Sequence, residues 1–217
     1  SAGGGNGDDG GTPLPLTEEP ADRTLAFASY ADNLVSDDTN GMKDIFLRNL
    51  DTGETERIST SHDGTRLDGD SFRPYLSADG KIVAFSSEAT NLVADDTNGV
   101  ADVFVYDRTS GETTRISLSN DGAEGDLECG TYLSLSADGQ YVAFTSDATN
   151  LIDEDNNGFR DVFVHDRETG QTTRVSVAGD GTEGDAGSIY PSLSENGRII
   201  SFASKATNLV ADDTNGM

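Results

Sequence analysis

The chain has 217 residues, of which 34% are hydrophobic and none is Trp, so it can form a domain of small strands and polar loops but no thick core. Its 40 acidic and 14 basic residues give a formal net charge of -26. Such a charge repels nucleic acids and anionic membranes and attracts cations, so we expect no nucleic-acid partner.

The N-terminal segment, residues 1–13, is rich in Gly and Asp and predicts a flexible tether ahead of a structured region at 14–217. It is similar to the stretch that follows the lipidated cysteine of bacterial surface lipoproteins, and a plain linker has the same composition. We therefore expect an extracellular or cell-surface protein, with a lipid anchor as one possibility. No run of about 18 apolar residues occurs, so no membrane span is predicted.

One segment recurs along the whole chain. Its copies are marked by Phe27, Phe85, Phe144 and Phe202, which lie 58, 59 and 58 positions apart. A fixed period of this size is typical of repeat proteins, in which each unit buries its apolar surface against its neighbours.

The second copy defines the repeat most clearly. Runs of Val, Ile, Phe, Tyr and Thr, separated by Asp-Gly and Ser-Gly turns, predict four strands near 75–77, 82–87, 102–106 and 113–118. No window has an apolar period of 3.6 residues, which excludes a helical solenoid. The first copy lacks the Asp-Gly turn and has Pro20 instead, so the pattern gives no clear first strand there.

The pattern Pro-x-Leu-Ser-x-Asp-Gly-x-x-Val-Ala-Phe-x-Ser at 74–87, echoed at 133–146 and 191–204, resembles the TolB-like, WD40-like propeller repeat. The resemblance implies an all-β fold, a β-propeller of four-stranded blades, with about 3.5 repeats of about 58 residues. Propellers close with about four to eight blades. A homodimer completing a seven-bladed ring, or further blades beyond Met217, would supply the missing units.

An acidic loop lies between the second and third predicted strands of each copy. The third copy places Asp153, Asp155, Asn157 and Asp161 at positions 1, 3, 5 and 9, with Gly158 at position 6. Hard oxygen ligands at this spacing suit Ca²⁺, and the carbonyl of Phe159 would add one more. The loop resembles those of integrin-type propeller repeats.

The other copies keep most of this pattern, although Ser36 and Ala94 replace the acid at position 1. Their predicted calcium ligands are Asp38, Asn40 and Asp44 in the first copy, Asp96, Asn98 and Asp102 in the second, and Asp213 and Asn215 in the fourth. The alternative is ordinary turn chemistry, because Asn and Asp side chains bond their own backbone. Recurrence in four copies favours calcium.

A second acidic loop follows the fourth predicted strand, at 63–70, 120–126 and 179–185. It could hold a ligand or a further cation, or it could be a solvated connection between blades.

Catalytic motifs are lacking, so we expect no enzyme activity from this chain. His62 and His165 fall at non-equivalent positions, and no Gly-x-Ser-x-Gly elbow occurs. Cys129, the one cysteine, is predicted to be a loop thiol without catalytic partners. The recurring Arg57, Arg115 and Arg174 are expected to pair with nearby acids such as Asp107 and Asp166, in a structural role.

Three functions remain open at this point. The first is an extracellular or surface calcium-binding propeller that acts as a binding or adhesion module for an unknown protein or glycan. The second is the propeller portion of a larger, peptidase-like enzyme, and the third is a purely structural surface repeat.

Overall fold

The computed structural model describes residues 23–153, 155–211 and 213, and this part of the chain is all-β, with no helix. Its strands are β1 (Thr24–Ser29), β2 (Asp44–Asn49), β3 (Thr55–Arg57), β4 (Ser71–Leu76), β5 (Ile82–Ser87), β6 (Asp102–Asp107), β7 (Glu112–Arg115), β8 (Cys129–Leu135), β9 (Tyr141–Ser146), β10 (Asp161–Asp166), β11 (Gln171–Arg174), β12 (Ser188–Leu193) and β13 (Ile200–Ser204).

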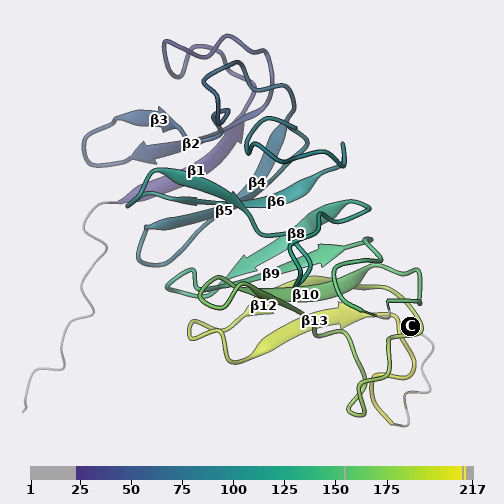
Figure 1. The fold of residues 1–217 in the computed structure, drawn as a ribbon. Coiled ribbons are helices and arrows are strands. Elements are labelled where there is room, and N and C mark those ends of the chain that lie inside the picture. The colour runs from purple at the N-terminus through teal and green to yellow at the C-terminus, as the bar shows by residue number, and fades with distance from the viewer. Residues whose placement is uncertain (1–22, 154, 212, 214–217) are drawn as a thin grey trace, which may run out of the picture.

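These strands form antiparallel sheets that follow one another along the molecule (Figure 1). Two sheets have four strands each, in the orders β4-β5-β6-β7 and β8-β9-β10-β11. Before them lies the three-stranded sheet β1-β2-β3, and after them the two-stranded sheet β12-β13. Each sheet pairs its strands in chain order, as expected for antiparallel strands that follow one another in the sequence.

The apolar core lies between neighbouring sheets. All six residues of β5 are buried, and alternate residues along it belong to different clusters. Val83 and Phe85 pack with β2, while Ile82 and Ala84 pack with β8 and β9. Side chains point alternately to the two faces of a strand, so this sheet is covered on both sides. The run Ile-Val-Ala-Phe is therefore continuously apolar.

A pair of stacked phenylalanines crosses each of the first three sheets. The ring centroids are 5.6 Å apart for Phe27 and Phe46, 5.9 Å for Phe85 and Phe104, and 5.8 Å for Phe144 and Phe163. Phe202 is the equivalent residue on β13, and there it is only half-buried. Ile199, just before β13, is 70% exposed, because the last sheet has no covering neighbour among the described residues.

The sequence pattern placed the central strands well. The segment 82–87 is confirmed as β5, and 102–106 lies within β6. The first strand of the unit begins earlier than predicted, at Ser71, and continues through a bulge between Phe72 and Tyr75. The predicted tether, and the segment of copy one for which the pattern gives no clear first strand, lie outside the described residues. The repeat count and the closure of a ring stay predictions.

The expectation for Cys129 was wrong. This residue begins β8, is completely buried, and lies 3.1 Å from the Ser146 hydroxyl. Burial raises the pKa of its thiol to about 12, which makes it an unreactive core group.

In the part of the chain that the structure describes, no helix could cross a bilayer.

Candidate functional site

The predicted ligand loops join the second and third strands of each unit. They run from β1 to β2, from β5 to β6 and from β9 to β10, and each ends with an Asp that begins the following strand. In each loop the structure brings together positions 3, 5 and 9 of the predicted pattern.

The position-9 carboxylates are Asp44, Asp102 and Asp161, and all three are 0% exposed. In each unit one carboxylate oxygen accepts a hydrogen bond from the position-5 asparagine, whose Nδ2 lies 2.8 Å away. The other oxygen accepts a hydrogen bond from a buried serine hydroxyl. These serines are Ser59, Ser117 and Ser176. The buried carboxylate is thereby held on both oxygens.

An arginine from the fourth-strand region lies between the acids at positions 3 and 9. Arg57 Nη1 is 3.2 Å from Asp38 and 3.5 Å from Asp44. The same guanidinium nitrogen of Arg115 lies 3.2 Å from Asp96 and 3.4 Å from Asp102.

The third unit repeats this arrangement, and a glutamate completes it there and in the second unit. Arg174 Nη1 is 3.0 Å from Asp155 and 3.4 Å from Asp161. Its Nη2 lies 2.9 Å from Glu183, as Arg115 Nη2 does from Glu124. We call each such group of arginine, aspartates, asparagine and serine an arginine network.

Each arginine network contains more acidic than basic groups, and this excess bears on the pKa of its acids. Burial raises the pKa of Asp96 and of Asp155 to about 6, and neighbouring carboxylates add to the effect. Burial also raises the pKa of Asp44 and Asp102, against the opposing hydrogen bonds from serine and asparagine.

The remaining predicted ligands are placed differently. Asp153 is exposed, and Phe159 is 45% exposed, with its backbone N–H donated to the Asn157 side chain at 2.8 Å. Asp213 lies in the loop after β13, and Asn215 lies outside the described residues.

The expected partners of the recurring arginines were wrong. They bind the loop acids of their own unit, and Asp107 instead lies 3.7 Å from Arg167. The buried serines were not predicted from the sequence. Their signal is the triplet Arg-Ile-Ser or Arg-Val-Ser, which recurs at 57–59, 115–117 and 174–176.

The second acidic loop ties each sheet to the next. The aspartate three residues before the first strand of the next sheet accepts hydrogen bonds from both the backbone N–H and the hydroxyl of a threonine that follows the second strand of that sheet. These pairs are Asp68 with Thr90 at 2.8 and 2.6 Å, Asp126 with Thr149 at 2.7 and 2.7 Å, and Asp185 with Thr207 at 2.6 and 2.7 Å. These carboxylates are thus engaged in hydrogen bonds. We call each such pair of aspartate and threonine an inter-sheet clasp.

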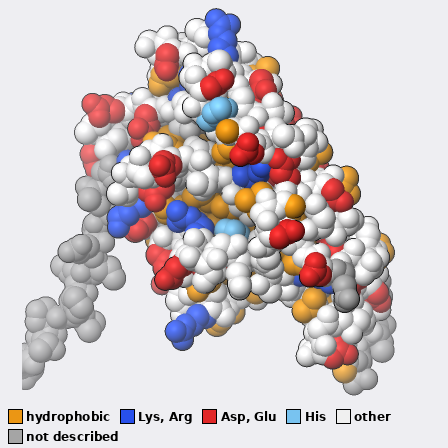
Figure 2. All heavy atoms as spheres, viewed as in Figure 1, with side chains coloured by type: hydrophobic (Ala, Val, Ile, Leu, Met, Phe, Trp, Pro, Cys, Tyr) orange, Lys and Arg blue, Asp and Glu red, His pale blue; other side chains and the backbone are white. Residues whose placement is uncertain are grey.

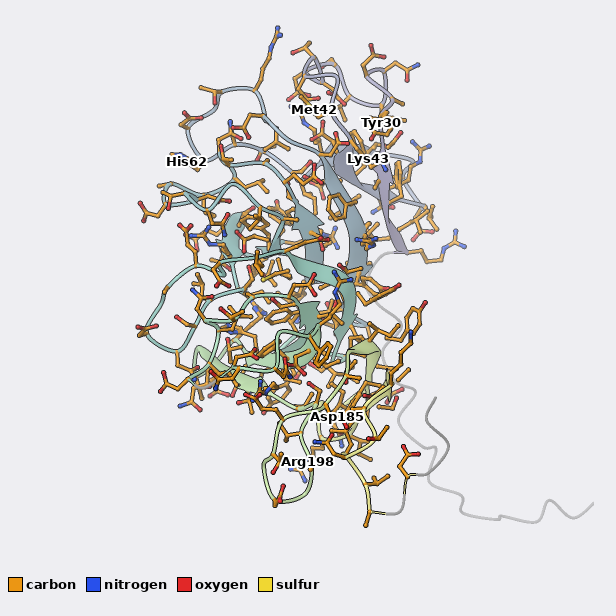
Figure 3. All side chains as sticks on the ribbon, turned by 90° about the vertical axis from the view of Figure 1, so that its right-hand side faces the viewer. Tyr30, Met42, Lys43, His62, Asp185 and Arg198 are labelled. Atoms are coloured by element: carbon orange, nitrogen blue, oxygen red, sulfur yellow. The ribbon has the colours of Figure 1, made fainter. Side chains whose placement is uncertain are left out.

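A polar recess of about 470 Å³ lies at another edge of the sheets. It is lined by Ala28, Lys43, Phe72, Arg73, Glu88 and Glu128. Lys43 Nζ is 4.8 Å from the ring centroid of Tyr30, and Figure 3 shows these two side chains together, far from His62.

Bulges present side chains from two of the first strands. Arg73, which lines the recess, lies within the bulge of β4 at φ 54°, and Tyr190 lies within the bulge of β12 at φ 57°. Tyr190 packs edge-on against Tyr132 with ring centroids 4.3 Å apart. Bulges commonly redirect side chains beside functional sites, and a left-handed tyrosine or arginine is a strained conformation.

Figure 2 shows the acidic side chains spread over the surface between fewer basic ones.

Comparison with known proteins places the fold. No protein-family model and no curated protein sequence matches the chain. Among solved structures, a putative TolB from Agrobacterium tumefaciens is similar over 87% of this chain and 52% of its own, with a TM-score of 0.52 and 19% identity.

Two further structures are similar. The tricorn protease covers 85% of this chain, with a TM-score of 0.53, 13% identity and 14% of its own length matched. Oligogalacturonate lyase from Vibrio parahaemolyticus covers 86% of this chain, with a TM-score of 0.50, 14% identity and 44% of its own length matched. The chain thus spans about half or less of each of these proteins. Its fold is that of a TolB-like β-propeller, and fold alone assigns no activity.

Proposed function

We propose that the chain is a non-catalytic, extracellular or cell-surface propeller module that binds a protein or glycan ligand at the recess beside β4. The observation that carries this proposal is Arg73, which lines the recess and is held at positive φ within the bulge of β4. Such strain is typically retained at ligand-binding positions. Among the described residues, the buried acids of the loops are engaged in the arginine networks.

A glycan array and an affinity pull-down with the purified chain test the proposal. Arg73→Gly removes the side chain presented at the recess while suiting the backbone, because glycine adopts positive φ readily. We expect a ligand that binds the wild type and is lost in this variant. Arg198→Ala, at an exposed position on another part of the surface, is the control. A ligand retained by Arg73→Gly would place binding elsewhere, and no ligand in either assay would favour a structural repeat.

The second candidate function is the propeller portion of a larger, peptidase-like enzyme, favoured by the similarity to the tricorn protease. A catalytic domain encoded next to this segment, together with peptidase activity of the joined protein, would support it.

The homodimer stays a prediction, and the number of strands in the two end sheets limits how it could form. β1 and β13 occupy equivalent places in their units, since Phe27 and Phe202 are equivalent residues. Joining the sheet β12-β13 of one copy to β1-β2-β3 of another would give one strand more than a four-stranded sheet holds. A shared sheet therefore requires one of these strands to leave. Light scattering would show whether the protein in solution is one copy of 22.8 kDa or two.

Calcium binding also stays a prediction, and chelation tests it directly. In each loop an arginine side chain lies beside the predicted ligand acids and would compete with the metal for them.

A further inference from the structure

We propose that Arg57, Arg115 and Arg174 are the resident cations of the three loops, and that these loops fold around a guanidinium in the place where the sequence predicts calcium. This inference goes beyond the ligand-binding proposal and does not depend on it.

The first support is the position of the positive charge. In each unit one guanidinium nitrogen lies within 3.5 Å of both acids that the pattern offers as metal ligands. The arginines of the second and third units are almost fully buried, with side-chain exposures of 7% and 6%. A buried guanidinium is always charged and supplies several donors in a fixed plane, which suits two facing carboxylates. A divalent cation between the same acids would lie against this positive charge.

The second support is the orientation of the asparagines at position 5. In each loop the asparagine Oδ1 accepts a backbone N–H from two residues further on, at 2.9 Å for Asn40, 3.0 Å for Asn98 and 2.8 Å for Asn157. The Nδ2 of each donates to the position-9 carboxylate. The amide thus offers a donor to the acids, whereas a calcium ligand would have to offer its oxygen.

The third support is the set of buried polar atoms without a hydrogen-bond partner. Among the described side chains these include the Nε atoms of all three arginines, which are donors that a metal ion cannot satisfy. No group of three or more His, Cys, Asp and Glu side chains in the described residues has an arrangement that could hold a metal. Asp96 Oδ1 is the one carboxylate oxygen in this set: it accepts no hydrogen bond, and Arg115 Nη1 lies 3.2 Å from it as its ion-pair partner. The second unit is therefore the most demanding test of the proposal.

The experiment compares thermal unfolding of the whole chain in EGTA, in CaCl₂ and in MgCl₂ at equal ionic strength. We expect the wild-type Tm to be the same in EGTA and in CaCl₂, and calorimetry to detect no saturable Ca²⁺ binding. A rise of Tm specific to CaCl₂ that Asp96→Asn or Asp155→Asn abolishes would overturn the proposal.

A charge-removing variant gives the converse result. Arg115→Gln frees the acids that Arg115 binds, so we expect a lower Tm in EGTA and a Ca²⁺-dependent recovery that the wild type lacks. Arg198→Gln removes the same charge from an exposed position, and we expect it to behave as wild type. If Arg115→Gln does not fold in EGTA, folding in CaCl₂ would support the proposal. If it folds in neither solution, the comparison of the wild-type Tm in EGTA and in CaCl₂ decides.

Discussion

Replacing Ser117 by Ala tests how strongly an arginine network stabilises the fold. The Ser117 hydroxyl is completely buried, donates to the Asp102 carboxylate and accepts the Val103 backbone N–H at 3.0 Å. The alanine removes both bonds and introduces no bulk.

The expected loss follows from the groups left without partners. A hydrogen bond to a charged group contributes about 1.5–3 kcal/mol, and an unsatisfied buried N–H costs about 1–3 kcal/mol. We expect the free energy of unfolding to fall by about 3 kcal/mol or more. A domain of this length changes Tm by about 2–4 °C per kcal/mol, so Tm should fall by about 6–12 °C.

Thermal and urea unfolding, followed by circular dichroism, measure the effect. Ser201→Ala on β13 is the matched control, because Ser201 is exposed and a change there should stay within about 0.5 kcal/mol. A loss of less than about 1 kcal/mol at Ser117 would refute the reasoning that this hydroxyl holds the network together.

Three further predictions concern other parts of the fold. Burial lowers the pKa of His165, so its unfolded form binds a proton that the folded form does not; stability should fall as pH drops below about 6.5, and His165→Tyr should reduce this fall in urea unfolding at several pH values. In Gly139→Ala the new Cβ would lie 2.6 Å from Ile82, so it should destabilise by about 1–3 kcal/mol more than Gly158→Ala, which has a similar φ but an open surrounding; equal losses would show that packing is not the cause. Asp126→Ala removes one inter-sheet clasp and should speed amide hydrogen exchange at 120–126 and 149–151, while exchange at β5 stays slow; unchanged exchange in the loops would contradict the role of the clasp.

Much of the fold could be predicted from the sequence because local patterns determine it. The apolar run at 82–87 and the Asp-Gly turns define strands and connections without knowledge of distant contacts. The start of β4 was missed because the bulge between Phe72 and Tyr75 interrupts the alternation that identifies a strand.

The site was predicted only in part, for a different reason. The convergence of Asp96, Asn98 and Asp102 follows from their spacing in one loop. The arrival of Arg115 between two of these acids depends on the pairing of β6 with β7, which sets Arg115 opposite Phe104. The position of a buried charge relative to a carboxylate is a tertiary property, and loop spacing alone could not separate a guanidinium from a metal ion.

The contacts of the arginine networks and of the inter-sheet clasps repeat with the period of the sequence. This affects how the number of units in the chain can change. Every partner of Arg115 lies between Asp95 and Glu124, within one period of the sequence. The clasps use an identical Asp and Thr at each boundary, so any unit can follow any other. Unequal recombination within the coding sequence could therefore delete or duplicate a whole period and leave the arginine networks and the clasps of the remaining units intact.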